Sequence, residues 1–185
     1  MVNAWEVLVT MTPADYASFR DSLGQSSGFQ SFQYRELEFL LGNKNSALIE
    51  AHRHHPKNYQ HLTKVLNAPS LYDVCLQLLQ KRGFDIALEQ TQRDWSQPYL
   101  SNKQVQTAWQ KVYQDTDTFW DLYELAEKLV DLEYHFQQWR FNHVKTVERI
   151  IGHKHGTGGT SGVDYLQKAL SLQFFPELWS VRTSL

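Results

Sequence analysis

Cysteine is almost absent from this chain of 185 residues, which contains one, Cys75. A single thiol excludes an internal disulfide and any metal site that needs a pair of cysteines. Cys75 lies among Leu71, Val74, Leu78 and Leu79 at helical spacing. We therefore expect a buried thiol in a reducing cytoplasm.

Long apolar runs and blocks of one charge sign are also absent. No stretch of about 18 apolar residues occurs, and residues 1–6 lack the basic and apolar regions of a signal peptide. The net charge is -2, with neither sign gathered into a block, which excludes the electrostatic footprint of a nucleic-acid or anionic-membrane binder. We expect a cytoplasmic protein with no nucleic-acid and no membrane partner.

Apolar residues make up 42% of the chain and aromatic residues 14%, enough for one substantial core, so we expect a single domain over residues 1–185. Nearly every segment has the apolar period of an α-helix, and the one alternating stretch, residues 5–11, is too short to establish a sheet. The predicted fold class is all-α, with no internal repeat.

Capping residues and glycines divide the chain into expected helices. A second helix should direct Phe32, Leu37 and Leu40 inward, whereas residues 43–60 are polar and predict a loop or a weak helix. An irregular connection is expected over residues 94–102, and an aromatic tail from Pro176. The expected helices span residues 12–23, 30–41, 70–82, 117–151 and 163–173.

The helix expected over residues 117–151 places a histidine, His143, on its apolar stripe. The other members of the stripe are Leu122, Leu125, Leu129, Leu132, Phe136, Trp139, Val147 and Ile150. One interpretation is a buried neutral histidine bonded to a backbone carbonyl. The other is an axial haem ligand, which leaves the sixth iron position free for dioxygen; zinc would need three or four convergent ligands. Nearby Trp139, Phe136 and Phe141 are expected in the core.

A glycine cluster, residues 156–162, follows this helix. It has neither the Gly-Lys-Ser/Thr ending of a P-loop nor a Gly-x-Ser-x-Gly elbow. It is either a flexible linker or a loop that lets backbone N–H groups and the Thr157 hydroxyl approach a ligand closely.

Tyr16 and Arg20 lie four residues apart on the first expected helix and so share a face. Arg20 is either an ordinary surface cation or, with the Tyr16 hydroxyl, a fork for a carboxylate. The loop that follows, residues 26–30, is also rich in small residues and would close such a pocket.

The remaining histidines give a weaker signal. A solvated loop is favoured over metal binding for His52, His54, His55 and His61, which have no carboxylate pattern nearby. His153 and His155 follow the long helix, where the helix dipole favours cations and where cofactor propionates would also be accommodated.

Three ordered motifs resemble the tryptophan 2,3-dioxygenase family. They are residues 19–23 leading into 26–35 (FRDSL and SSGFQSFQYR), residues 139–143 (WRFNH) and residues 156–162 (GTGGTSG). The ending of residues 174–179, FFPELW, fits the bacterial members, and the resemblance covers the chain from Trp5 onward.

The resemblance implies an all-α enzyme, usually a homotetramer, that uses haem b and O2 to convert L-tryptophan into N-formyl-L-kynurenine. His143 matches the proximal haem ligand, Arg20 the arginine that pairs with the substrate carboxylate, and Tyr16 an aromatic residue of the same pocket. Thr157 matches the threonine that contacts the substrate ammonium and carboxylate. Ser27 and Gly28 match the loop near the haem and the indole.

The chain departs from the family pattern at its start. Members of the family have an N-terminal portion with a Phe-x-x-x-His element that forms the distal wall, and nothing in residues 1–3 replaces it. We expect a fragment of a normal dioxygenase rather than a short paralogue. The alternatives are a non-catalytic haem-binding or oligomerisation module and, less favoured, an all-α protein without a cofactor.

Overall fold

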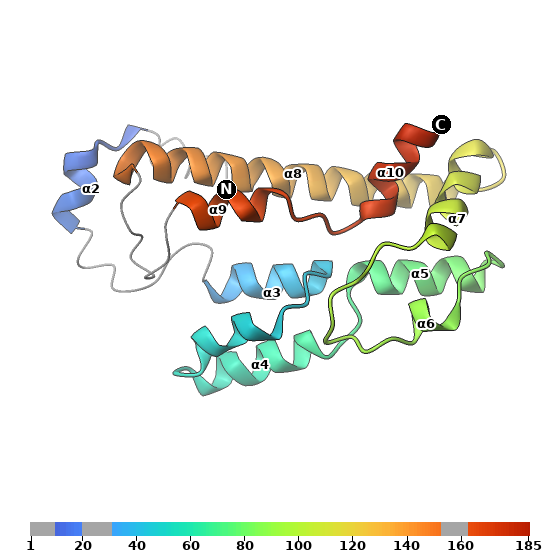
Figure 1. The fold of residues 1–185 in the computed structure, drawn as a ribbon, viewed down its shortest axis with the longest axis horizontal. Coiled ribbons are helices and arrows are strands. Elements are labelled where there is room, and N and C mark those ends of the chain that lie inside the picture. Colours follow the sequence, from blue (N-terminus) through green and yellow to red (C-terminus); the bar gives the residue numbers. More distant parts are fainter. Residues whose placement is uncertain (1–9, 20–30, 153–162) are drawn as a thin grey trace. The chain divides into compact units, whose positions relative to one another are not determined.

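The computed structural model describes residues 10–19, 31–152 and 163–185. Those residues form helices and connections and no strand, which confirms the all-α fold class (Figure 1). The helices are α2 (Pro13–Phe19), α3 (Phe32–Leu41), the 3₁₀ helix η3 (Ser46–His52), α4 (Pro56–Leu66), α5 (Leu71–Lys81), α6 (Leu88–Thr91), α7 (Lys103–Gln114), α8 (Trp120–Ile151), α9 (Val163–Leu170) and α10 (Pro176–Ser184).

The chain divides into two compact units. The first unit comprises Met1–Ser31 and His135–Leu172, and the second comprises Phe32–Tyr134 and Gln173–Leu185. Helix α8 contributes its beginning to the second unit and its end to the first. The expectation of a single domain stays a prediction.

Local capping explains where several helices begin and end. The Thr12 hydroxyl accepts from the Asp15 amide at 3.1 Å at the start of α2, and Ser70 and Asp73 form a reciprocal capping box at the start of α5. Gly42 ends α3 with a φ of 116°, a left-handed conformation that glycine adopts without strain. These boundaries confirm the expected start at residue 12, start at residue 70 and stop at residue 42.

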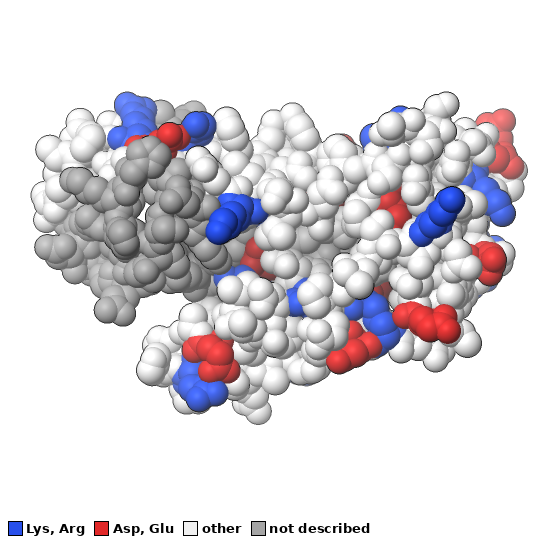
Figure 2. Space-filling model, viewed as in Figure 1, with Lys and Arg blue, Asp and Glu red and all other residues white. Residues whose placement is uncertain are grey.

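Surface charges of both signs are mixed. Figure 2 shows Lys and Arg side chains interspersed with Asp and Glu on the visible face of the described residues. Among those residues, no helix combines the length and the apolar character needed to cross a membrane. The mixing of the two signs agrees with the charge pattern of the sequence.

The inward face of α3 differs from the expected one. Leu37 and Leu40 are 43% and 42% exposed, whereas Arg35 and Glu38 are buried. The two buried charges form an ion pair one turn apart, and Asn43 Nδ2 donates to Glu38 Oε1 at 3.2 Å. The charged side chains can be buried because they satisfy one another.

Residues 43–60 are more ordered than their polar composition suggests. Helix η3 begins at Ser46, after the N-cap Asn45, whose side chain accepts from the Ala47 amide, and α4 begins with Pro56 in its first turn. Both helices pack with α3 around a small core of Phe39, Ile49, Leu62 and Leu66. Of the two expected alternatives, a loop or a weak helix, the structure has helix over most of this segment.

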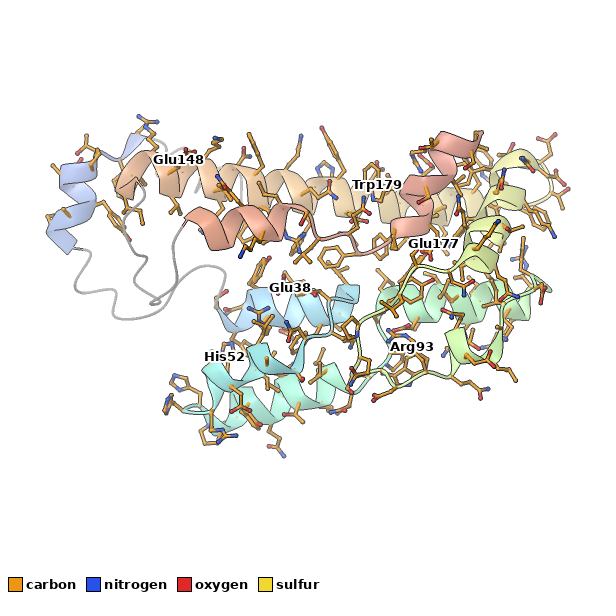
Figure 3. The ribbon with its side chains drawn as sticks, in the orientation of Figure 1. Glu38, His52, Arg93, Glu148, Glu177 and Trp179 are labelled. Carbon is orange, nitrogen blue, oxygen red and sulfur yellow. The ribbon has the colours of Figure 1, made fainter. Side chains whose placement is uncertain are left out.

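A buried carboxylate, Glu177, organises the packing of α5, α7 and α10 in the second unit. Figure 3 labels Glu177 at the start of α10. Its Oε2 accepts from the Tyr72 hydroxyl at 2.8 Å, and its Oε1 accepts from the Tyr99 hydroxyl at 2.7 Å and the Asn102 amide at 2.6 Å. The Tyr72 oxygen also accepts from the Trp109 indole at 3.1 Å. The expected aromatic tail is thus helix α10, and its first turn supplies an acceptor to the core.

The buried face of α8 follows the expected apolar stripe only in its first part. Leu122 and Leu129 are buried, but Leu132 is 40% exposed, and the neighbouring Glu133 is fully buried. Farther along, Arg140 is also fully buried. Since one residue corresponds to about 100° of rotation on an α-helix, the buried face has turned away from the expected stripe.

Glu133 is buried because it binds irregular backbone. Its carboxylate accepts from the amides of Phe174 and Phe175 at 2.8 and 3.1 Å and from the Trp179 indole at 2.9 Å. A connection without regular structure leaves N–H groups without helical partners, so an acceptor on α8 replaces an apolar side chain there.

Candidate functional site

His143 lies on α8, in the part of the helix that belongs to the first unit, and its side chain is half-buried. Burial lowers the pKa of His143 from 6.5 to about 4, because a charged imidazole loses more on leaving water than a neutral one does. The ring is therefore neutral near pH 7, the form in which histidine binds a metal.

The Trp139 indole fixes the orientation of that ring. The His143 and Trp139 rings are stacked, with 5.6 Å between centroids and 16° between planes. The two residues are one turn apart on α8, a spacing that places their side chains side by side. A stacked ring has fewer accessible rotamers than a free one, so the imidazole is presented in a restricted orientation.

The donor set suits a single axial bond rather than a multidentate metal ion. Within residues 10–19, 31–152 and 163–185, His, Cys, Asp and Glu form no group of three or more able to hold a metal. A structural or catalytic zinc would need three or four such ligands, whereas haem iron needs one axial imidazole from the protein. Among the residues that the structure describes, His143 therefore fits haem better than a bare ion.

The histidines of the η3–α4 region divide into two kinds. His54 and His55 are exposed, and His61 lies 2.6 Å from a Glu36 oxygen at the surface. His52, in contrast, is buried, and its Nε2 has no hydrogen-bond partner. The expectation of a solvated loop is wrong for His52, because η3 turns this side chain inward.

Tyr16 is the second predicted site residue that the structure describes. It is half-buried on α2, a helix of the first unit, and its amide donates to the Thr12 carbonyl at 3.1 Å. The structure thus places Tyr16 and His143 in the same unit. Other predicted positions lie outside the described residues, namely Arg20, Ser27, Gly28, Thr157, His153, His155 and the rest of the glycine cluster.

One buried residue beside His143 was not identified as important in the sequence. Arg140 is 0% exposed, and its Nη1 donates to the carbonyl oxygen of Leu172 at 3.0 Å. Its guanidinium lies 4.8 Å from the centroid of the Phe136 ring. Periodicity could not reveal the burial of Arg140, because an arginine between apolar stripes usually marks a solvated position.

The expected core position of Phe141 is wrong, since its side chain is 51% exposed.

Two comparisons with known proteins, one with a family model and one with individual relatives, agree on one family. A family model described as tryptophan 2,3-dioxygenase matches residues 1–69 and 110–185. Tryptophan 2,3-dioxygenases of Burkholderia pseudomallei (strain 668) and Burkholderia mallei (strain SAVP1) are each 57% identical over 185 residues. The alignments cover 100% of this chain and 60% of each relative, so the chain spans about three fifths of their length.

Proposed function

This chain belongs to the tryptophan 2,3-dioxygenase family, and we propose that it carries the haem ligand and the substrate clamp of such an enzyme. The proposed reaction opens the pyrrole ring of L-tryptophan with O2 and gives N-formyl-L-kynurenine. One structural observation carries the proposal. A neutral imidazole, His143, is held against Trp139 on α8, at the position where the family resemblance places the axial ligand.

His143 would hold haem b through one ring nitrogen. Bound haem would supply the iron chemistry that the reaction with dioxygen needs. The protein contributes the orientation of the ligand, through the Trp139 stack, and a partly dry surrounding that keeps the imidazole neutral. Neither contribution needs a second metal-binding side chain.

The substrate clamp would come from Arg20, Thr157 and Tyr16. The Arg20 guanidinium would pair with the tryptophan carboxylate, because its planar fork matches the two carboxylate oxygens. Thr157 would contact the ammonium and carboxylate, and Tyr16 would line the same pocket. Fixing the amino-acid end in this way would hold the indole in one orientation. Ser27 and Gly28 would lie near the haem and the indole.

The proposed oligomeric state and cellular location follow from the family resemblance. We propose that the chain acts in a homotetramer and in the cytoplasm. Because the chain spans 60% of the length of its relatives, the second candidate is a haem-binding or oligomerisation module without turnover. The two candidates share the His143 ligand and differ in whether L-tryptophan is consumed.

A haem titration of the purified 185-residue chain tests the proposal. A stoichiometric Soret band that shifts when carbon monoxide is added to the reduced form would support the haem site. Consumption of L-tryptophan with formation of N-formyl-L-kynurenine would support the dioxygenase, and haem binding without consumption would support the non-catalytic module. The absence of any specific haem spectrum would overturn both candidates.

A further inference from the structure

Arg140 is a fully buried cation one turn before His143 on α8. A charge is buried only when polar partners replace water. One partner of the Arg140 guanidinium is a backbone group. Arg140 Nη1 donates to the carbonyl oxygen of Leu172 at 3.0 Å. This hydrogen bond attaches the segment that follows α9 directly to α8.

The same guanidinium begins a continuous series of ring contacts that ends at the imidazole. It lies 4.8 Å from the centroid of the Phe136 ring, one turn earlier on the helix. The Phe136 ring lies 5.9 Å from that of Trp139 at 46°, and Trp139 is stacked on His143 at 5.6 Å and 16°. Each contact is between neighbours on one helix, so displacing one ring leaves space beside the next.

We propose that Arg140 is a positioning residue that sets the ring plane of His143 through Phe136 and Trp139. The inference rests on the proposed function, in which His143 is the axial ligand. Leu172 anchors the guanidinium from outside the helix, and the guanidinium carbon lies over the Phe136 ring. The orientation of the ligand thus depends on the segment after α9 as well as on α8 itself.

Arginine is suited to this task and lysine is not. A guanidinium is planar, so it can stack on a ring with its face while donating from its edge. A lysine ammonium keeps the charge but has no flat face to support Phe136. Arg140→Lys therefore separates the charge from the geometry, and Arg140→Met removes the charge and the donors while keeping a long apolar side chain.

Nuclear magnetic resonance of the haem-free chain gives the first measurement. Stacking on the indole should shield the ring protons of His143, whose signals are assigned by their loss in His143→Ala. In Arg140→Lys and Arg140→Met, we expect most of this shielding to be lost. Unchanged His143 signals in a folded Arg140→Lys chain would overturn the proposal.

Two further variants distinguish a change in the position of the His143 ring from a change in the stability of the chain. Glu133→Gln removes another buried charge of α8 that binds Phe174 and Phe175, so it should destabilise the chain without moving the His143 signals. Phe136→Leu removes the intermediate ring without leaving a buried charge unpaired, and it should reduce the shielding as Arg140→Lys does. If the Arg140 variants fail to fold by circular dichroism, Phe136→Leu decides, and retained shielding in that variant would refute the series of contacts.

The haem-loaded chain gives an independent reading. Arg140→Lys should shift the iron–imidazole vibration in the resonance Raman spectrum while retaining stoichiometric haem. An unshifted vibration would count against Arg140. Failure of the unaltered chain to bind haem would overturn the proposed function but not the shielding result, so the two failures can be told apart.

Discussion

The imidazole of His143 lies nearly parallel to the indole of Trp139, with 5.6 Å between the ring centroids and 16° between the ring planes. Burial lowers the pKa of this imidazole to about 4. Together, the stack and the lowered pKa give a neutral ring in a defined orientation. Neutrality and orientation are what an axial ligand needs before the iron binds.

Glu133→Gln should lower the free energy of unfolding by about 2–4 kcal/mol, since hydrogen bonds to a buried charge contribute about 1.5–3 kcal/mol and an unsatisfied donor adds a penalty. The carboxylate accepts from Phe174, Phe175 and Trp179, and an amide has one acceptor oxygen fewer. Urea unfolding followed by circular dichroism measures the change. The control is Glu127→Gln, which alters a partly exposed ion pair with Arg182 and should change the value by less than about 1 kcal/mol. Equal effects of the two substitutions would refute the buried role of Glu133.

Tyr72→Phe should destabilise the second unit by about 2–3 kcal/mol, because it removes a donor to a buried carboxylate and leaves a buried indole without an acceptor. Tyr72 donates to Glu177 at 2.8 Å and accepts from Trp109 at 3.1 Å. The shift in the urea midpoint, with an unchanged slope, is the measurement. Tyr59→Phe, at a hydroxyl that contacts the exposed Glu50, is the matched control. A midpoint equal to that of the unaltered chain would contradict the network.

Because His52 is buried, the folded chain should lose stability in mild acid. Burial, then Arg35 and His55, lower the pKa of His52 below its ordinary 6.5. The unfolded chain therefore binds a proton that the folded chain resists, and stability falls as the pH drops below about 6.5 and through the lower folded pKa. In His52→Leu, the difference in unfolding free energy between pH 8 and pH 5 should be smaller than in the unaltered chain. The exposed His54→Leu should keep the full difference; if His52→Leu also keeps it, His52 is not the titrating group.

Arg20→Ala should weaken L-tryptophan binding to the haem-loaded chain by roughly 10- to 150-fold, the equivalent of about 1.5–3 kcal/mol for a charged hydrogen bond. Haem content should not change, because Arg20 is proposed to contact the substrate and not the iron. The perturbation of the Soret band by added tryptophan measures the dissociation constant. Arg20→Lys keeps the charge without the fork, so its dissociation constant for L-tryptophan should lie between those of the unaltered chain and Arg20→Ala. Unaltered affinity in Arg20→Ala would remove this residue from the clamp.

Sequence patterns predicted the fold class and the boundaries of several helices, such as α3 and α5, because these depend on local chemistry, but they did not predict α6 or α7. The capping box of Ser70 and Asp73 and the left-handed Gly42 act within a few residues of the chain. Patterns predicted the buried faces less well. Glu133 and Arg140 are buried because they bind the backbone of residues 172–175, which are distant in sequence and invisible to periodicity.

The candidate site was predictable to a different extent at each residue. His143 was identified because it replaces an apolar residue in a helical stripe, and its half-buried position is compatible with that prediction. The supporting Arg140 was missed, because no local pattern distinguishes a buried arginine from a surface one. His52 was assigned to solvent because polar neighbours surround it, although η3 buries its ring.

The most direct test of the central claim, that His143 is the axial ligand, is a haem titration of His143→Gly with and without free imidazole. The exposed His135→Gly is the control, since glycine within a helix costs about 1 kcal/mol at either position. We predict that His143→Gly loses the stoichiometric, carbon-monoxide-sensitive Soret band, that added imidazole restores it, and that His135→Gly retains it. An unchanged haem spectrum in His143→Gly without imidazole would contradict the account.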